Sequence, residues 1–160
     1  RLYRLLTAPL SADLPASLAH SGPGLGLMGL QTTAAALVSE NKSLSWPSSV
    51  DSIPTCEDQE DHVAMSTTAA RRASEVVRNG LIVVQIELLA SSKALQWRLE
   101  SDGVSTLGRG TQAALEVLRS IPEDLTAPAE ALEQVPALIP ELLAAVDEAC
   151  PGLRRLGASS

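Results

Sequence analysis

The chain has 160 residues, enough for one domain with a buried core, and a formal net charge of 12 − 19 = −7. Hydrophobic residues make up 45%, yet Phe is absent and the only aromatic residues are Tyr3, Trp46 and Trp97. This Ala- and Leu-rich composition favours closely packed helices and argues against an all-β sandwich. The negative charge argues against nucleic-acid binding. Cys56 and Cys150 are too few for a disulfide framework, so we expect a reducing, cytoplasmic compartment.

Residues 1–26 are predicted to form a looped arm, because Pro9, Pro15 and Pro23 interrupt the segment together with several Gly and Ser residues. The chain begins without Met and without a signal sequence, so we expect a piece of a longer or processed chain. No stretch approaches the ~18 apolar residues that a membrane span needs.

Residues 27–100 are predicted to form long helices. Apolar spacing predicts a first helix from Leu27 to about Glu40. Residues 41–61 then predict a loop too long for a simple connection, and such loops tend to carry function.

After this loop, the pattern predicts two further helices. Thr55 and Asp58 have the spacing of a capping box, so one helix is predicted to begin there and to run to about Arg78. Asn79-Gly80 permits a break or kink before a second helix over 81–98. The apolar residues of that second helix cover nearly every face, so we expect partner subunits to bury it.

Residues 101–160 are predicted to form short helices. Thr111 can cap one that ends near Arg119. Four later prolines predict short helices near 128–134 and 140–149, with a stop at Pro151-Gly152 and a frayed end from Gly157.

A glycine pattern typical of dinucleotide binding occurs at Gly24, Gly26 and Gly29, with Asp51 downstream. Such a site needs a buried strand before the glycines, and the preceding segment contains Pro15 and no two-residue alternation. We therefore interpret the glycines as permitting tight entry into a crowded helix.

Other chemistry has less support. His20 and His62 are not spaced as a ligand pair and no nucleophile-elbow sequence occurs, so we expect neither a metal site nor a catalytic triad. Cys56 precedes Glu57 and Asp58, which disfavour a thiolate, so it is interpreted as structural.

The segment from Thr55 to His62 holds four carboxylates, an amide and an imidazole. One interpretation is a helix N-terminus with solvated acids. The other is that Glu60 faces a cleft as an acid/base group or substrate anchor, positioned by Gln59 and His62. Physical reasoning on these residues leaves both interpretations open.

Six motifs follow one another along the chain: Ala34–Lys42, Pro47–Thr55, Gln59–Val63, Ala69–Arg72, Ile86–Ala90 and Leu107–Thr111. Together with Arg1–Leu6, they resemble the C-terminal part of the histidine and aromatic amino acid ammonia-lyase family. The resemblance is strong from Leu27 to Arg98 and loose after Ile121.

This resemblance implies a mainly helical homotetramer, whose long central helices bundle together and whose active sites combine residues from three subunits. Family members eliminate ammonia from an α-amino acid or, in the aminomutase branch, move it to the β-carbon. Their electrophile is a methylidene-imidazolone formed from an internal Ala-Ser-Gly. That triplet is absent from this chain. The resemblance therefore implies that an N-terminal portion of the enzyme supplies it and that this chain alone is inactive.

The resemblance also implies roles for individual residues. Glu60 matches the family's glutamate in the Gln-Glu-Asp-His stretch, which implies that it is catalytic, orienting the amino acid and taking part in proton transfer. Gln59 is its neighbour and is expected to bind substrate. Asp61 and His62 are expected to support these two by holding the start of a helix. Glu87, in another motif, is expected to be a paired structural acid.

Two departures from the family pattern concern the substrate. Ser45-Trp46-Pro47 stands where Ala-His-Pro is common, and Asp58 precedes Gln59 where a neutral residue is common. We therefore expect a divergent lyase or aminomutase that acts on an aromatic amino acid. A histidine ammonia-lyase and a non-catalytic helical assembly or regulatory subunit remain alternatives.

Overall fold

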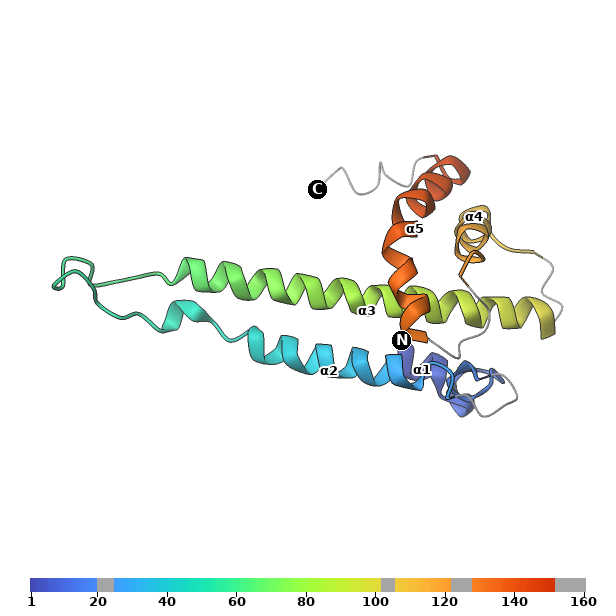
Figure 1. The fold of residues 1–160 in the computed structure, drawn as a ribbon, viewed down its shortest axis with the longest axis horizontal. Helices are drawn as coiled ribbons and strands as arrows, with labels where there is room; N and C mark the ends of the chain where they lie inside the picture. The colour runs from blue at the N-terminus through green and yellow to red at the C-terminus, as the bar shows by residue number, and fades with distance from the viewer. Residues whose placement is uncertain (20–24, 102–105, 122–127, 152–160) are drawn as a thin grey trace. The chain divides into compact units, whose positions relative to one another are not determined.

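A computed structural model describes residues 1–19, 25–101, 106–121 and 128–151 (Figure 1). The regular secondary structure in these ranges consists of helices only, which confirms the predicted all-α class. The α-helices are α1 (Leu2–Leu6), α2 (Met28–Leu44), α3 (Ser66–Ser101), α4 (Arg109–Leu118) and α5 (Pro128–Ala149). Short 3₁₀ turns lie at Ala8–Leu10, Ala16–Leu18 and Ser48–Val50. Expectations for His20, Gly24, Gly152 and the end from Gly157 lie outside the described ranges.

The chain divides into two compact units. The first contains Arg1–Gln31 and Gln85–Ser160, and the second contains Thr32–Val84. The second unit therefore holds most of α2, the long loop and the first half of α3. In the parts of the chain that the structure describes, no helix is both long and apolar enough to cross a bilayer.

The predicted arm, residues 1–26, contains helix α1 and two 3₁₀ turns. Leu6, Leu14 and Leu18 are buried. From α3, the guanidinium of Arg98 donates hydrogen bonds to the carbonyls of Ser11, at 2.9 Å, and of Ala12. These contacts tie the arm to α3 within the first unit.

Helix α3 is continuous for 36 residues, about 54 Å at the usual rise per residue. The predicted break at Asn79-Gly80 is therefore wrong, as is the predicted helix start near Thr55. Asn79 is buried and its side-chain amide donates a hydrogen bond to α2. The side chain therefore does not bond to the nearby backbone in competition with the hydrogen bonds of the helix. A glycine inside a helix costs only about 1 kcal/mol relative to Ala, which a helix of this length tolerates.

The second half of α3 supplies much of the first unit's core. Ile86, Leu89 and Ala90 are at most 1% exposed. On the same helix, Glu87 forms an ion pair with Arg1, with 2.7 Å between Oε1 and Nε. The expected pairing of Glu87 is thus present, and its structural role stays a prediction.

Helix α5 runs unbroken through Pro136 and Pro140, so the two predicted short helices are one helix of 22 residues. Both prolines are exposed and lie four residues apart, so the carbonyls that they leave without helical partners face one side of the helix. Ala131 and Val135 are buried and form an apolar stripe in the part of the helix before Pro136. Figure 1 shows that α5 changes direction along its length, as interior prolines usually cause.

Helices α4 and α5 pack against each other. At Gly110, a β-carbon would lie 3.1 Å from the sulfur of Cys150, so the two helices approach closely there. The N-cap residue of α4 is Gly108, without a side-chain cap, and not Thr111 as predicted.

Of the two glycines of the rejected dinucleotide pattern that the structure describes, Gly26 is the crowded one. Its φ is +55°, and a β-carbon there would lie 2.3 Å from the carbonyl oxygen of Ser17. That oxygen also accepts a hydrogen bond of 2.8 Å from the amide of Leu27, at the entry to α2. Gly29 differs, because a β-carbon there would meet no atom within 4 Å.

We predict that Gly26→Ala lowers the free energy of unfolding by about 3 kcal/mol, since it combines a left-handed backbone with an overlap against Ser17. The matched variant Gly29→Ala is expected to be neutral or stabilising by up to about 1 kcal/mol, because it adds helix propensity in open space. Urea denaturation of both variants checks this. Equal stabilities would contradict the predicted role of Gly26.

A polar junction formed by Glu40, Asn41 and Asn79 joins α2 to α3 in the second unit. The Asn79 side-chain amide, on a residue only 5% exposed, donates to Oε2 of Glu40 at 2.9 Å and to Oδ1 of Asn41 at 3.0 Å. In return, Nδ2 of Asn41 donates to the carbonyl of Val76 at 3.3 Å. The junction fixes which turn of α2 faces which turn of α3.

We predict that Asn79→Ala destabilises the protein by about 1–3 kcal/mol, because Glu40 and Asn41 lose a buried donor. Ser74→Ala, at an exposed position of the same helix, serves as the control and should change stability by less than about 0.5 kcal/mol. Denaturant midpoints measure the difference. If Asn79→Ala were as stable as Ser74→Ala, the junction would have no energetic importance.

Candidate active-site loop

The polar segment singled out from the sequence forms a tight hairpin. The amide of Thr55 donates to the carbonyl of Glu60 at 3.1 Å, and the amide of Glu60 donates back to the carbonyl of Thr55 at 3.3 Å. Across this pair, the Thr55 hydroxyl donates to Oε2 of the Glu60 carboxylate at 3.1 Å. Residues 56–59 form the turn, closed by a further bond of 3.2 Å from the Gln59 amide to the Cys56 carbonyl.

Three consecutive residues of this turn have left-handed backbones. The φ angles of Cys56, Glu57 and Asp58 are +55°, +56° and +66°. A right-handed helix cannot pass through such residues, which is why the predicted capping box does not form. Each left-handed residue other than glycine costs about 1–2 kcal/mol, so the hydrogen bonds across the turn hold a strained loop.

A second tie lies beneath the hairpin. The hydroxyl of Ser52 accepts a hydrogen bond of 2.9 Å from the amide of Val63, and both residues are half-buried. The two segments that flank the turn are thus joined at two levels.

All four predicted site residues lie together on this hairpin or just after it. Glu60 and Gln59 are exposed, with Glu60 at the closing pair and Gln59 in the turn. The other oxygen of Glu60, Oε1, makes no hydrogen bond to any residue that the structure describes. Asp61 and His62 are also exposed and lie between the two ties, before α3 begins at Ser66. The roles proposed for these four residues remain predictions.

A pocket of about 420 Å³ is formed by residues on both sides of the hairpin in the sequence. The guanidinium of Arg72, on α3, donates to the carbonyl of Trp46 at 3.0 Å and holds the segment after α2 in place. The residues that line the pocket are Trp46, Pro47, Ser48, Val50, Asp51, Ile53, Met65, Thr68 and Arg72. Asp51, downstream of the glycine pattern, is exposed and lines this pocket together with apolar side chains, Ser48, Thr68 and Arg72.

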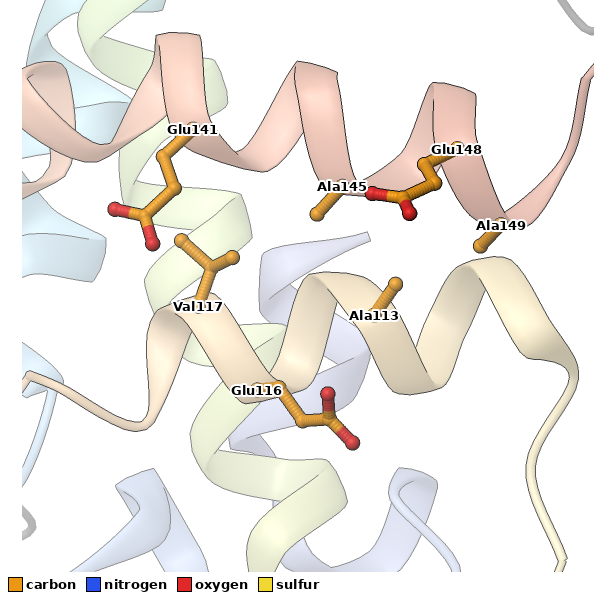
Figure 2. Close-up of a pocket in the computed structure, with 7 residues that line it drawn as sticks. All are labelled: Ala113, Glu116, Val117, Glu141, Ala145, Glu148 and Ala149. Atoms are coloured by element: carbon orange, nitrogen blue, oxygen red, sulfur yellow. The ribbon is translucent and has the colours of Figure 1, made fainter.

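A separate groove of about 510 Å³ lies between α4 and α5. Figure 2 shows Val117 of α4 pointing toward Glu141 of α5, with Glu116 on the side of α4 away from α5. Its polar lining residues are Glu116, Glu141 and Glu148 and the others are small or apolar, so no residue that lines it could bind a carboxylate. We therefore place no amino acid site there.

The described ranges contain no group of three or more His, Cys, Asp or Glu residues that could hold a metal ion. Cys56 and Cys150 are free thiols, and Cys56 is exposed in the turn.

Sequence reasoning missed the link between Thr55 and Glu60, because the capping-box interpretation paired Thr55 with Asp58. The available signal was the run of polar residues that follows Pro54 and ends before Val63. Such a run also fits a loop that reverses the chain direction. Left-handed residues without glycine give no such signal in the sequence.

Comparisons with known proteins agree with the motifs. The family model described as aromatic amino acid lyase matches residues 1–120. The histidine ammonia-lyase of Streptococcus sanguinis is 41% identical over 162 aligned positions, covering 93% of this chain and 30% of the relative. That of Caldanaerobacter subterraneus is 55% identical over 100 residues, covering 61% of this chain and 19% of the relative.

Solved structures give the same result. A tyrosine aminomutase from Streptomyces globisporus has a TM-score of 0.77 at 31% identity and covers 92% of this chain and 29% of its own. A histidine ammonia-lyase from Trypanosoma cruzi has a TM-score of 0.76 at 32% identity, with the same coverage. The chain therefore spans less than a third of the length of these relatives. With a family match over three quarters of its residues and the same helical fold, the chain belongs to the aromatic amino acid lyase family.

Proposed function

We propose that the chain is the C-terminal portion of an ammonia-lyase or aminomutase that acts on an aromatic amino acid, and that Glu60 is its catalytic group. The observation that supports this most is the Glu60 carboxylate at the closing pair of the hairpin, on an exposed residue and with Oε2 bonded to Thr55. A family whose members remove ammonia from amino acids requires a group that can take a proton or hold an ammonium.

Elimination of ammonia breaks the Cα–N bond, removes a proton from the β-carbon and forms a carbon–carbon double bond. A carboxylate can hold the substrate ammonium by a charge-assisted hydrogen bond and can accept a proton. Glu60 is proposed for these two roles and Gln59 for binding the substrate. Asp61 and His62 are proposed to support them from the segment between the two ties.

The electrophile would come from outside this chain. The sequence has no Ala-Ser-Gly from which a methylidene-imidazolone could form, so its residues fit the role of acid/base and binding groups only. When bound in the complete enzyme, that group would supply the electrophilic carbon that activates the substrate. We accordingly propose that the N-terminal portion of the same enzyme carries the triplet.

Uncovered apolar side chains on α3 support assembly with other chains. Val77, Leu81 and Val84 are 61%, 57% and 60% exposed and form one stripe at helical spacing in the second unit. A tetramer whose long helices bundle together, as proposed from the family resemblance, would cover such a stripe.

We predict that Glu60→Gln in the full enzyme lowers kcat by about 10²–10⁴-fold, because the amide keeps the shape but cannot accept the proton. Glu57→Gln removes a carboxylate from the same turn and is the matched control, expected to stay within about twofold. Steady-state ammonia release measures both. Full activity of Glu60→Gln would eliminate the catalytic role of Glu60.

A second candidate is a histidine-specific ammonia-lyase, favoured by the identity of 41–55% to enzymes of that name. We predict turnover of L-phenylalanine or L-tyrosine by the full enzyme, with an unsaturated acid or a β-amino acid as product. Chromatography of reactions with each of the three amino acids separates the candidates. Turnover of histidine alone would support the second. No turnover of any would favour the non-catalytic assembly subunit.

A further inference from the structure

The hydroxyl of Thr55 is the only side-chain donor bonded to Glu60 among the residues that the structure describes. Thr55 lies directly across the closing pair of the hairpin, and its hydroxyl reaches Oε2 of Glu60 at 3.1 Å. Because directly opposed residues of an antiparallel pair share one face, these two side chains lie side by side.

We propose that Thr55 is a positioning residue for the reaction, acting by orienting the Glu60 carboxylate. The proposal rests on the catalytic role proposed for Glu60. Thr55 would not touch the substrate; its hydroxyl would occupy Oε2 and leave Oε1 directed at the reacting amino acid.

The physical need for such a residue follows from the exposure of the hairpin. A glutamate side chain has several freely rotating bonds, and an exposed one samples many rotamers. Catalytic groups are effective only when held near the reacting atom, and an error of about 1 Å can cost up to about 100-fold in rate. One charge-assisted hydrogen bond from a short, β-branched side chain restricts the carboxylate at little entropic cost.

The backbone of the hairpin does not depend on the hydroxyl. The two backbone hydrogen bonds of the Thr55–Glu60 pair and the Ser52–Val63 tie are separate from it. Valine has nearly the same shape as threonine and prefers extended backbone. Thr55→Val therefore removes the contact with Glu60 while leaving the fold of the loop unchanged.

The test uses the full enzyme. Thr55→Val is expected to lower kcat about tenfold with little change in KM or in the thermal midpoint, because the carboxylate is misplaced and the fold is kept. Thr55→Ser keeps the hydroxyl and is expected to restore kcat to within about twofold. Thr67→Val makes the same chemical change at an exposed position of α3 and should leave kcat unchanged. If Thr55→Val does not fold, Thr55→Ala, which also lacks the hydroxyl, is used in its place.

A double-mutant cycle with Glu60→Ala separates positioning from a merely structural role. If Thr55 acts through the carboxylate, Thr55→Val has no further effect on kcat once the carboxylate is gone. Equal effects in both backgrounds, or a Thr55→Ser variant as slow as Thr55→Val, would overturn the proposal. Failure of the proposed function would give a different result from failure of the Thr55 proposal. If Glu60 is not catalytic, Glu60→Ala itself leaves kcat unchanged.

Discussion

The second unit depends on the pairing of α2 with α3 through Asn79. Its buried amide joins Glu40 and Asn41 by two hydrogen bonds, and a buried donor without partners would cost more than each bond contributes. This asymmetry selects one register of the two helices. The register in turn determines where the chain leaves α2 after Leu44 and enters α3 at Ser66, and so where the loop between them begins and ends.

Within that loop, backbone strain and polar contacts oppose each other. Three left-handed residues raise the energy of the turn, and the Thr55–Glu60 pair and the Ser52–Val63 bond lower it. A loop held in this way is more rigid than its exposure alone would indicate. The acid/base role proposed for Glu60 depends on a carboxylate that is held in place in this way.

Much of this architecture follows from the sequence, and the failures have identifiable causes. Composition and apolar spacing predicted the helical class and α2, and the family motifs pointed to the segment that contains Glu60. The predicted break at Asn79-Gly80 failed because a tertiary contact with α2 satisfies the asparagine. The predicted division into two helices at Pro136 and Pro140 was wrong because the carbonyls that both prolines leave without helical partners face one exposed side of α5. Thr55 and Asp58 have a capping-box spacing, but local spacing contains no information on the left-handed backbone that forms instead.

The left-handed turn also limits how the loop can vary. Glycine, asparagine and aspartate adopt positive φ at low cost, whereas valine, isoleucine and threonine do so only with severe strain. Of positions 56–58, only Asp58 has a residue that adopts a positive φ at low cost, so Cys56 and Glu57 carry most of the strain of the turn. Replacing Cys56 or Glu57 by glycine, asparagine or aspartate would therefore relieve backbone strain next to Glu60, whereas a β-branched residue at either position would increase it.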